Sequence, residues 1–425
     1  MHKKALIITY YWPPAGGPGV QRWLKFVTYL PDYDIQPIVY CPENPNYPIV
    51  DESLCAEIPK ELIILKQPIK EPYRFANLVS KKSSKTISSG VIPKEKKQTF
   101  IQKLMLFVRG NFFIPDARKR WIQPSVTFLS DYIQKEQIET IITTGPPHSL
   151  HLIGLQLKAR LGVTWLADFR DPWTTIGYHK KLRLTASSKA KHLQLEKDVL
   201  ITADQIIVTS ENTKKEFSTK TKQPITVITN GYDTTSIEKP LKDDKFTLAH
   251  IGSLLSERNP KQLWKILNEL ILENADFKAA FELKLVGVVS NDVLESIADF
   301  NLKEYTCLKG YVSHNEALIE QKQSQVLLLI EIDSEDTKAI IPGKLFEYMV
   351  SDTPILAIGP KASDVERIIN NTNTGSYFNY DDEVRLKSQI LAYFEAYKTN
   401  SLTTYPIGLQ QYSRKALTKT LSELI

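Results

Sequence analysis

Cysteine is scarce in this sequence. Only Cys41, Cys55 and Cys307 occur among 425 residues, and they lie far apart, without the paired spacing of a zinc site or a disulfide framework. Such sparse thiols are typical of a reducing compartment, so we expect a cytoplasmic protein. Long apolar runs are missing as well. No stretch reaches the length of a membrane-spanning helix, and the apolar run near the N-terminus is too short for a secretory signal, so any membrane contact should be peripheral, at the inner face.

Motifs for cofactors and metals are absent or misplaced. The glycines between residues 16 and 19 do not form the G-x-G-x-x-G pattern of dinucleotide sites, and no acidic residue follows at the required place. Asp32 and Asp34 have the D-x-D spacing of some metal sites, but they precede a strand, whereas ligands of α/β sheets bind beyond the carboxyl ends of strands. His148 and His151 lack a third metal ligand. The sequence therefore predicts neither a cofactor nor a metal.

The overall composition suits a soluble globular protein with more than one core, since 42% of the residues are hydrophobic and 24% are charged. We expect two domains at this length. The net charge of +6 is unevenly distributed. Residues 66–120 hold ten Lys and four Arg against three acidic residues, a local charge of +11 that leaves about −5 for the rest of the chain.

Part of this basic region is also aromatic. Residues 99–109 predict a helix with a wide apolar face and cations at its edges, and Phe112, Phe113 and Trp121 follow it. The segment 95–121 is therefore a candidate for peripheral contact with an anionic membrane. A helix packed on its own domain with a solvated basic rim explains the pattern equally well. No stacking motif or known module is present, so we expect no nucleic-acid partner.

The N-terminal part of the chain predicts the start of a parallel sheet. A strand at Lys4–Tyr10 leads through a glycine-rich turn into an amphipathic helix. Gly16 and Gly17 let the backbone approach a ligand closely and leave the N–H groups of the helix free for an anion. A simple tight turn is the alternative.

A second candidate site follows the strand that begins near Trp165. Asp168, Arg170 and Asp171 emerge at the carboxyl end of this strand, where sites form in α/β sheets. A carboxylate there can position or deprotonate an acceptor hydroxyl, and Asp171 is our candidate for that role. His148, on the neighbouring loop, is a weaker candidate. The alternative is a salt bridge among Asp168, Arg170 and Asp171.

The order of strand, glycine loop and helix recurs in the second half of the chain. The strand at Phe246–Ile251 is followed by Gly252 and by a helix whose start carries Arg258 and Lys261. An Arg and a Lys at a helix N-terminus suit two bridging phosphates. Two merely exposed cations are the weaker alternative, because the N-terminus of a helix disfavours cations when no anion is bound.

The most informative stretch begins with the unbroken apolar run Val326–Ile330, which predicts a buried parallel strand. Pro342 and Gly343 then open a short helix, on which Lys344 and Glu347 share a face. This arrangement offers N–H groups to a phosphate and, one turn inside the helix, a carboxylate to a sugar hydroxyl. An ordinary β-α-β unit with a solvated Lys and Glu is the alternative.

Four segments, taken in this order on two repeated strand–loop–helix starts, resemble glycosyltransferase family 4. The resemblance spans nearly the whole chain and implies an α/β GT-B fold, in which two Rossmann-like domains face each other across a cleft. The four segments are Gly16–Gly19, Asp168–Trp173, Gly252–Lys261 and Pro342–Glu347.

The turn Asn230–Asp233 and the polar linker at 236–245 mark the passage between the two expected domains. In line with the resemblance, we expect a Rossmann-like acceptor-binding domain at 1–235 and a Rossmann-like nucleotide-sugar-binding domain at 236–405. A C-terminal helix at 406–425 should return to the first domain, as in GT-B folds generally.

The resemblance also assigns roles to single residues. Glu347 matches the second Glu of the family's Glu-x7-Glu motif, which holds the ribose of the donor. The first Glu, which contacts the transferred sugar, falls on Ala339, so the motif is incomplete here. Arg258 matches the Arg that neutralises the leaving diphosphate. The adjacent Lys of many members is Asn259 in this chain, which leaves Lys261 as its substitute.

Other members place a catalytic or acceptor-contacting His near Asp171, where this sequence has Asp. In the family, the turn after Gly310 lies against the nucleobase, so Tyr311 and Val312 are expected to contact it through their backbone. The expected catalytic residues are Asp171, Arg258 and Lys261; the donor-binding residues are Gly16, Gly17, Gly252, Arg258, Lys261, Tyr311, Val312, Gly343, Lys344 and Glu347; the acceptor-binding residues are His148, Asp168 and Arg170.

This resemblance implies a retaining glycosyltransferase that moves a sugar from a nucleoside-diphosphate sugar, its co-substrate, to a glycan or polyprenyl-linked acceptor in cell-surface polysaccharide synthesis. No metal is expected, because cations and helix N-termini would stabilise the leaving diphosphate. Two alternatives stay open. A catalytically silent homologue would bind glycan or membrane as a scaffold, and a nucleotide-sugar 2-epimerase would convert the donor without any acceptor.

Overall fold

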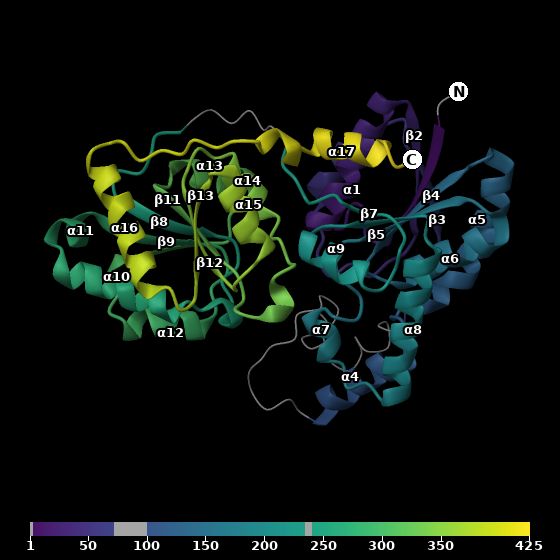
Figure 1. The fold of residues 1–425 in the computed structure, drawn as a ribbon, viewed down its shortest axis with the longest axis horizontal. Helices are drawn as coiled ribbons and strands as arrows, with labels where there is room; N and C mark the ends of the chain where they lie inside the picture. The colour runs from purple at the N-terminus through teal and green to yellow at the C-terminus, as the bar shows by residue number, and fades with distance from the viewer. Residues whose placement is uncertain (1–2, 72–99, 234–239) are drawn as a thin grey trace. The chain divides into compact units, whose positions relative to one another are not determined.

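The computed structural model describes three segments of the chain: residues 3–71, 100–233 and 240–425. These form two compact units, which we call the first unit (Met1–Asn230 with Arg414–Ile425) and the second unit (Gly231–Ser413) (Figure 1). Both units are α/β folds built on a parallel sheet. Residues 236–239 of the predicted linker and residues 95–99 of the predicted membrane segment lie outside the described residues.

A seven-stranded parallel sheet forms the centre of the first unit, in the order β3-β2-β1-β4-β5-β6-β7. Its strands are β1 (Lys3–Ile8), β2 (Ile35–Pro42), β3 (Ile63–Gln67), β4 (Thr140–Gly145), β5 (Thr164–Phe169), β6 (Gln205–Val208) and β7 (Ile225–Val227). The strand order reverses between β1 and β4, which are hydrogen-bonded neighbours. In open α/β sheets such a reversal is the switch point at which ligands bind, beyond the carboxyl ends of the strands.

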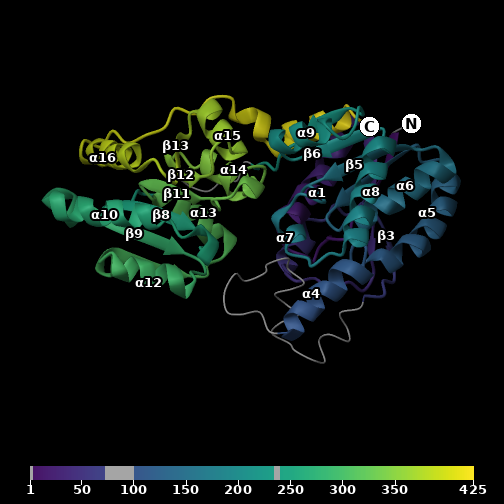
Figure 2. The ribbon, with the colours of Figure 1, turned by 60° about the horizontal axis from the view of Figure 1, so that its bottom comes forward.

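Helices cover the first sheet on both faces because both faces of β1 are apolar. Leu6 and Ile8 pack into one core, and Ala5 and Ile7 pack into the other. Figure 2 shows α5 and α6 side by side on the same flank of the unit. The helices are α1 (Pro18–Tyr29), α4 (Phe100–Phe112), α5 (Ile122–Glu136), α6 (Ser149–Leu161), α7 (Gly177–Lys180), α8 (Ala186–Thr202), α9 (Glu211–Ser218) and α17 (Arg414–Ser422).

Helix α17 belongs to the first unit although it follows the second unit in the chain. Leu417 and Leu421 pack in the same core as Ile7. Lys415 forms an ion pair of 3.2 Å with Asp32, the first carboxylate of the D-x-D sequence. This aspartate therefore has a structural partner, far from the carboxyl ends of the strands.

A six-stranded parallel sheet forms the centre of the second unit, in the order β10-β9-β8-β11-β12-β13, with its own reversal between β8 and β11. Its strands are β8 (Phe246–Ile251), β9 (Phe281–Val286), β10 (Thr306–Gly310), β11 (Val326–Ile330), β12 (Ile355–Gly359) and β13 (Gly375–Asn379). Its helices are α10 (Lys261–Glu273), α11 (Ala275–Ala280), α12 (Asn291–Asp299), α13 (His314–Gln323), α14 (Lys344–Met349), α15 (Asp364–Thr372) and α16 (Glu383–Lys398).

Local sequence explains these elements well. The apolar run of β11 is fully buried, as a strand covered on both faces requires. Helix α10 buries Leu263, Leu267 and Leu270 along one face. Helix α13 begins with a complete capping box, in which Ser313 and Glu316 each accept a hydrogen bond from the other's backbone N–H.

The C-terminal helix is shorter than the sequence predicts. A short 3₁₀ helix, Leu409–Tyr412, comes first, and Ser413 then takes an extended conformation before α17 begins. Ser413 is extended because it forms a parallel bridge with Tyr232, whose N–H donates to the carbonyl of Tyr412 at 3.1 Å. The chain thus pairs with itself where it leaves the first unit and where it returns.

Candidate functional site

The predicted site segments emerge at the two switch points. In the first unit the glycine loop follows β1 and the loop with His148 follows β4, while Asp171 follows the next strand, β5. In the second unit the loop with Gly252 follows β8, and the segment that leads to Lys344 follows β11. Because paired parallel strands end at the same edge of a sheet, each unit brings its own segments together.

Gly17 ends the loop that follows β1. Its backbone has φ +108° and ψ 165°, a conformation that glycine adopts without strain. Its carbonyl accepts hydrogen bonds from the N–H groups of Val20 and Gln21 at 3.0 and 3.2 Å. Gly16 lies close to Ile49, whose Cγ2 atom would be 3.0 Å from an added Cβ. No side chain caps α1. Because Pro18 has no N–H and the next two donors bond to Gly17, the first turn offers at most the N–H of Gly19 to an anion.

Arg170 joins three loops at this edge of the sheet. Its N–H donates to the carbonyl of Gly145 at 2.9 Å, and its own carbonyl accepts from the hydroxyl of Thr209 at 2.8 Å. Its guanidinium donates to the carbonyl of Pro146 and covers Gly19, where an added Cβ would lie 1.7 Å from Nη1. The Nε atom of Arg170 is buried without a partner among the described residues. The side chain therefore brings positive charge to the glycine loop.

The carboxylate of Asp171 makes no hydrogen bond or ion pair with any described residue. Burial raises the pKa of this carboxyl, and the charge of Arg170 opposes that shift. The salt bridge that the sequence allowed among Asp168, Arg170 and Asp171 is not formed in the described part of the chain. A carboxyl with a raised pKa and unused oxygens is suited to hold or deprotonate a hydroxyl.

Asp168 is fully buried and serves the fold. Its Oδ2 atom accepts from the indole N–H of Trp23 at 2.9 Å and from the hydroxyl of Thr144 at 2.7 Å. Its Oδ1 atom pairs with Arg22 at 3.2 Å, and the same guanidinium donates to the carbonyl of Thr229. This placement does not fit the acceptor role predicted for Asp168, because donors from α1 and β4 already occupy both oxygens.

His148 also lies inside the first unit, with 5% of its surface exposed. Its ring stacks on Trp173 at a centroid distance of 4.8 Å, and neither ring nitrogen has a partner among the described residues. Three other histidines, His151, His179 and His192, are buried close to His148. Burial lowers the pKa of all four rings, so they are neutral near pH 7. This setting does not fit the acceptor contact predicted for His148.

Lys344 is the central cation of the second unit. Its ammonium lies 3.1 Å from Nε2 of His250 and 3.1 Å from the carbonyl of Ile251. The other ring nitrogen of His250 lies 3.0 Å from the carbonyl of Leu328, so the ring proton is on Nδ1 and Nε2 accepts from Lys344. Burial lowers the pKa of Lys344 to about 7, and the charge of Arg258 adds to this shift. An anion at this place would draw a proton onto the amine.

Arg258 supplies the second cation. Its guanidinium makes no hydrogen bond or ion pair with the described residues, and its Nε atom is buried. Burial lowers its pKa, which the nearby carboxylate of Glu331 opposes. Gly252, at φ +114°, brings its backbone close to Lys344, because a Cβ there would lie 3.5 Å from the ammonium. Two enclosed cations next to a glycine loop form a site suited to a diphosphate.

Glu347 lies one turn after Lys344 on α14, as the helical spacing predicts. Its Oε2 atom accepts from the amide of Gln321 at 3.3 Å, and its Oε1 atom lies 3.7 Å from Nε2 of His314. A quarter of its side chain is exposed. The carboxylate is thus oriented by α13 while part of it stays open to a ligand.

The remaining predicted donor residues lie at the surface or within helical backbone. Lys261 is exposed at the first position of α10, and Tyr311, after β10, is 88% exposed. Val312 is half-buried and packs on a core of the second unit. Gly343 has ordinary helical angles, with its carbonyl accepting from Phe346 at 3.2 Å. Of these residues, only Lys261 carries a charge toward solvent.

Glu331 was missing from the sequence-based set. It directly follows β11 at the switch point, is 3% exposed, and accepts from the hydroxyls of Ser363 and Tyr377 at 2.9 and 2.7 Å. Burial raises its pKa to about 8, against these hydrogen bonds and the charge of Arg258. The signal available in the sequence was a carboxylate placed immediately after five buried apolar residues.

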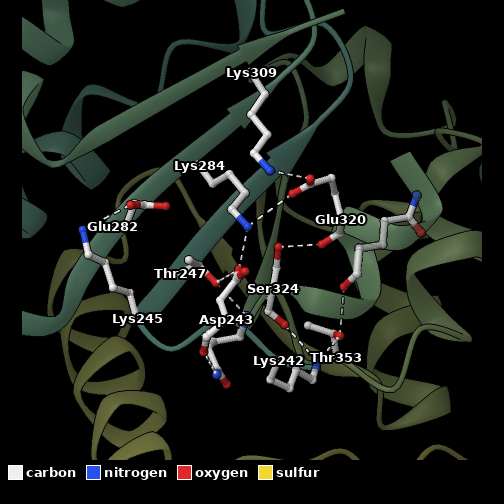
Figure 3. A network of polar contacts seen from close by, with 12 residues as sticks. Lys242, Asp243, Lys245, Thr247, Glu282, Lys284, Lys309, Glu320, Ser324 and Thr353 are labelled. Carbon is white, nitrogen blue, oxygen red and sulfur yellow. Dashed lines mark hydrogen bonds and ion pairs between the residues drawn. The ribbon is translucent and has the colours of Figure 1, made fainter. Parts of the chain in front are cut away.

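An ion network joins α13 to strands of the second sheet. Figure 3 shows the ammonium of Lys284, on β9, between the carboxylates of Asp243 and Glu320, at 2.6 and 3.2 Å. Lys309 pairs with Glu320 at 2.5 Å. Although burial lowers the pKa of Lys284, its two carboxylate partners raise it overall. The network therefore keeps α13 fixed to the sheet.

The same network reaches the segment that enters the second unit. The ammonium of Lys242 donates to the hydroxyl of Thr353 at 2.7 Å and to the carbonyl of Ser324 at 2.9 Å (Figure 3). Thr353 in turn donates to the carbonyl of Gln321 at 3.1 Å. Because Gln321 holds Glu347, a continuous set of hydrogen bonds connects the linker to this carboxylate.

Two kinds of feature are absent from residues 3–71, 100–233 and 240–425. No group of three or more His, Cys, Asp or Glu side chains is arranged to hold a metal ion. Across the same ranges, no helix combines the length and the apolar character that crossing a membrane requires.

No protein-family model matches the chain, and no curated protein matches it in sequence. Solved structures match it over nearly full length at low identity. A sucrose-phosphate synthase from Thermosynechococcus elongatus is 14% identical, with a TM-score of 0.59 over 99% of this chain and 98% of that one. A variant of S. aureus TarM in complex with UDP is 12% identical, with a TM-score of 0.57 over 99% of both chains.

A third match is a protein described as a putative UDP-N-acetylglucosamine 2-epimerase from Listeria monocytogenes. It is 12% identical, with a TM-score of 0.54 over 99% of this chain and 95% of that one. At these identities the matches establish the fold alone. Two parallel α/β units and full-length similarity to glycosyltransferase structures give the chain the predicted GT-B fold class.

Proposed function

We propose that this protein is a retaining glycosyltransferase of the family 4 type. It transfers a sugar from a nucleoside-diphosphate sugar to a glycan or polyprenyl-linked acceptor in cell-surface polysaccharide synthesis, in the cytoplasm and in peripheral contact with the inner membrane. The observation that carries the proposal is the pair Arg258 and Lys344, two enclosed cations at the switch point of the second unit, neither of which forms an ion pair with a described residue.

On this proposal the second unit binds the donor. Arg258 and Lys344 hold the diphosphate beside Gly252, and Lys261 adds charge from the start of α10. Glu347, oriented by Gln321, accepts from the ribose hydroxyls. As the bond to the sugar breaks, the leaving diphosphate gains charge, and cations already in place stabilise it without a metal.

The first unit would receive the acceptor. Asp171 is the candidate to hold or deprotonate its hydroxyl, since its oxygens are unused and its pKa is raised by burial. Arg170 and the backbone N–H of Gly17 offer positive charge to a phosphate at the same edge of the sheet, whereas the N–H of Gly16 already donates to the carbonyl of Ile49 at 3.1 Å. Asp168 and His148 then act indirectly, by fixing α1 and the loop after β4.

Similarity to known structures is consistent with this proposal but reaches only the fold. The TarM variant was solved with UDP, and another matching structure is a sucrose-phosphate synthase. The match to the epimerase structure supports a second candidate function, a nucleotide-sugar 2-epimerase, because an epimerase would use the same diphosphate site. Ala339 stands where the family has its first Glu, and this difference supports a third candidate, a silent homologue that binds glycan or membrane without turnover.

The first test is calorimetric titration of the whole chain with UDP, GDP and dTDP. One of these should bind, and the Glu347→Ala variant should bind it about 10- to 150-fold more weakly, as the loss of a charged hydrogen bond worth roughly 1.5–3 kcal/mol predicts. Lys303→Met, at an exposed position of the same unit, is the control and should bind normally. Failure of all three nucleotides would reject the donor site.

The second test separates the candidates. The matching nucleotide sugar, incubated alone, should remain unchanged apart from slow hydrolysis, whereas an epimerase would convert it. With a lipid-linked glycan acceptor, NMR of the product should show the donor's anomeric configuration. A silent homologue that binds glycan or membrane as a scaffold would bind no nucleotide sugar and form no product.

A further inference from the structure

Helix α4 of the first unit exposes an apolar stripe. Leu104, Phe107, Val108 and Phe112 are 51, 37, 37 and 63% exposed. The last three follow Leu104 by three, four and eight residues, which places all four on one face of the helix. Four large apolar side chains that share one exposed face need an explanation, whereas single exposed ones do not.

Helix α4 is packed on the unit, because Leu106, on the side of the helix away from the stripe, is only 4% exposed. Gly110 lies so close to Leu184 that an added Cβ would be 2.7 Å from Cδ2 of that residue. The side chain of Asn111 donates to the carbonyl of Arg183 and accepts from the N–H of Thr185, both at 2.8 Å. Both ribbon views place α4 beside α7 and α8 (Figures 1 and 2).

These contacts bring together two basic segments that are far apart in the sequence. Helix α4 carries two basic and no acidic residues, and residues 177–195 carry five basic and no acidic residues. On the helical wheel, Lys103 and Arg109 border the stripe on its two sides. The five cations of the second segment are exposed: Lys180, Lys181, Arg183, Lys189 and Lys191.

We propose that this surface, the stripe of α4 with the cations of residues 177–195, docks the protein onto an anionic lipid bilayer. The stripe enters the boundary between headgroups and acyl chains, with α4 parallel to the membrane, and the cations lie among the anionic headgroups. The proposal rests on the peripheral membrane contact included in the proposed function and names the surface that makes this contact; it does not depend on the chemistry of transfer.

The combination of charge and apolar area selects this partner over others. A soluble polyanion would engage the cations and leave Leu104, Phe107, Val108 and Phe112 in water. A second copy of the chain would bring the same positive charge against this surface, which repulsion disfavours. A bilayer with anionic headgroups satisfies both parts of the surface at once.

The experiment is sedimentation of the whole protein with vesicles of phosphatidylcholine containing 30 mol% phosphatidylglycerol. Leu104→Ser with Phe107→Ser should reduce the partition coefficient at least tenfold, while Leu272→Ser with Val384→Ser, at even more exposed apolar positions of the second unit, should not change it. Lys181→Ala with Arg183→Ala should reduce it about 25-fold, since each basic residue contributes about fivefold at such a surface. Lys278→Ala with Lys303→Ala is the matched control.

Binding should also fall steeply between 0.1 and 0.5 M salt and be weak on pure phosphatidylcholine. Equal binding to neutral vesicles, or none to anionic ones, would overturn the proposal. Loss of binding only in the charge variant, together with competition by polyphosphate, would show a surface for soluble polyanions instead. Thermal unfolding and nucleotide titration of every variant separate a docking defect from a folding defect, and failure here leaves the proposed transfer reaction untouched.

Discussion

The two units have the same strand reversal at their centre, and each has charged side chains near it. In the first unit the buried carboxylate at this place has internal partners, whereas in the second unit two of the charges form no ion pair with a described residue. In the first unit the buried carboxylate of Asp168 is satisfied by Arg22, Trp23 and Thr144. In the second unit Arg258 and Lys344 are enclosed without a counter-ion among the described residues.

The difference shows that a buried charge at a switch point is not in itself a binding site. A charge whose partners are all internal contributes to folding and is costly to disturb. A charge left uncompensated costs stability in the free protein and recovers it when a ligand of opposite sign binds. The four predictions below test this contrast, from the largest expected effect to the smallest.

Arg22→Met should destabilise the first unit by about 3–5 kcal/mol, because it leaves the carboxylate of Asp168 charged and buried without its ion partner. The measurement is the free energy of unfolding in urea. Lys25→Met, on the same helix, breaks a more exposed pair with Glu57 and should cost less than about 1 kcal/mol. Similar losses in the two variants would show that Asp168 does not need Arg22.

His148→Phe should make the first unit more resistant to acid. The pKa of His148 lies well below 6.5 in the folded state, so its contribution is present above pH 6.5 and is lost as pH falls, when the unfolded chain binds a proton that the folded one does not. At pH 4.5 the substitution should therefore add stability that it does not add at pH 7.5, at most about 1.4 kcal/mol for each pH unit below 6.5. Unfolding curves at pH 7.5 and 4.5 give the difference.

No hydrogen bond is lost in this change, because neither ring nitrogen has a partner among the described residues and Phe can stack on Trp173 as well. If the substitution changed the free energy of unfolding equally at pH 7.5 and 4.5, His148 would be protonated in the folded protein at the lower pH. It would then return as a candidate for acceptor binding.

Lys344→Met should leave the free protein as stable as before or more stable, the opposite sign to Arg22→Met. The folded pKa of Lys344 is lowered to about 7, so its charged form costs stability below pH 10.5, and the cost is complete below pH 7. Nucleotide diphosphate affinity should meanwhile fall about 10- to 150-fold, for the loss of a charge-assisted bond worth roughly 1.5–3 kcal/mol. Urea unfolding and calorimetry measure the two effects, and a large loss of stability would make Lys344 a structural residue.

Nucleotide diphosphate affinity should fall between pH 7 and 9, by up to about tenfold per pH unit. Above pH 7 the amine of Lys344 is mostly neutral in the free protein, and binding must supply its proton. Below pH 7 it is already charged, so the affinity should level off. The Lys344→Met variant should show no such slope, and a slope that persists in it would assign the proton to another group.

Much of the fold could be predicted because its signals are local. Apolar runs such as Val326–Ile330, the glycine turns at Gly17 and Gly252, and the i, i+3 placement of Lys344 and Glu347 are all set within a few residues of chain. The extended residue that interrupts the C-terminal helix was not predictable, since it depends on a bridge to a segment nearly two hundred residues earlier.

The candidate site was predicted only where helical or loop spacing decides it. Whether Asp168 faces a ligand depends on Arg22 and Trp23, which are 146 and 145 residues away in sequence. The lowered pKa of Lys344 depends on its enclosure against His250, across 94 residues. Partners at such distances come from the packing of whole elements, which no local pattern records.

The position of α17 has a consequence for how the protein is made. The first unit contains Leu417 and Leu421 in its core, yet the ribosome adds them only after the whole second unit has been synthesised. Domains generally fold as they emerge, N-terminal ones first. Here the earlier unit lacks the part of its core that α17 supplies until synthesis is nearly finished, so the second unit is the first that can be completed. A chaperone that shields apolar surface would act on the first unit, where α1 already covers part of the same core.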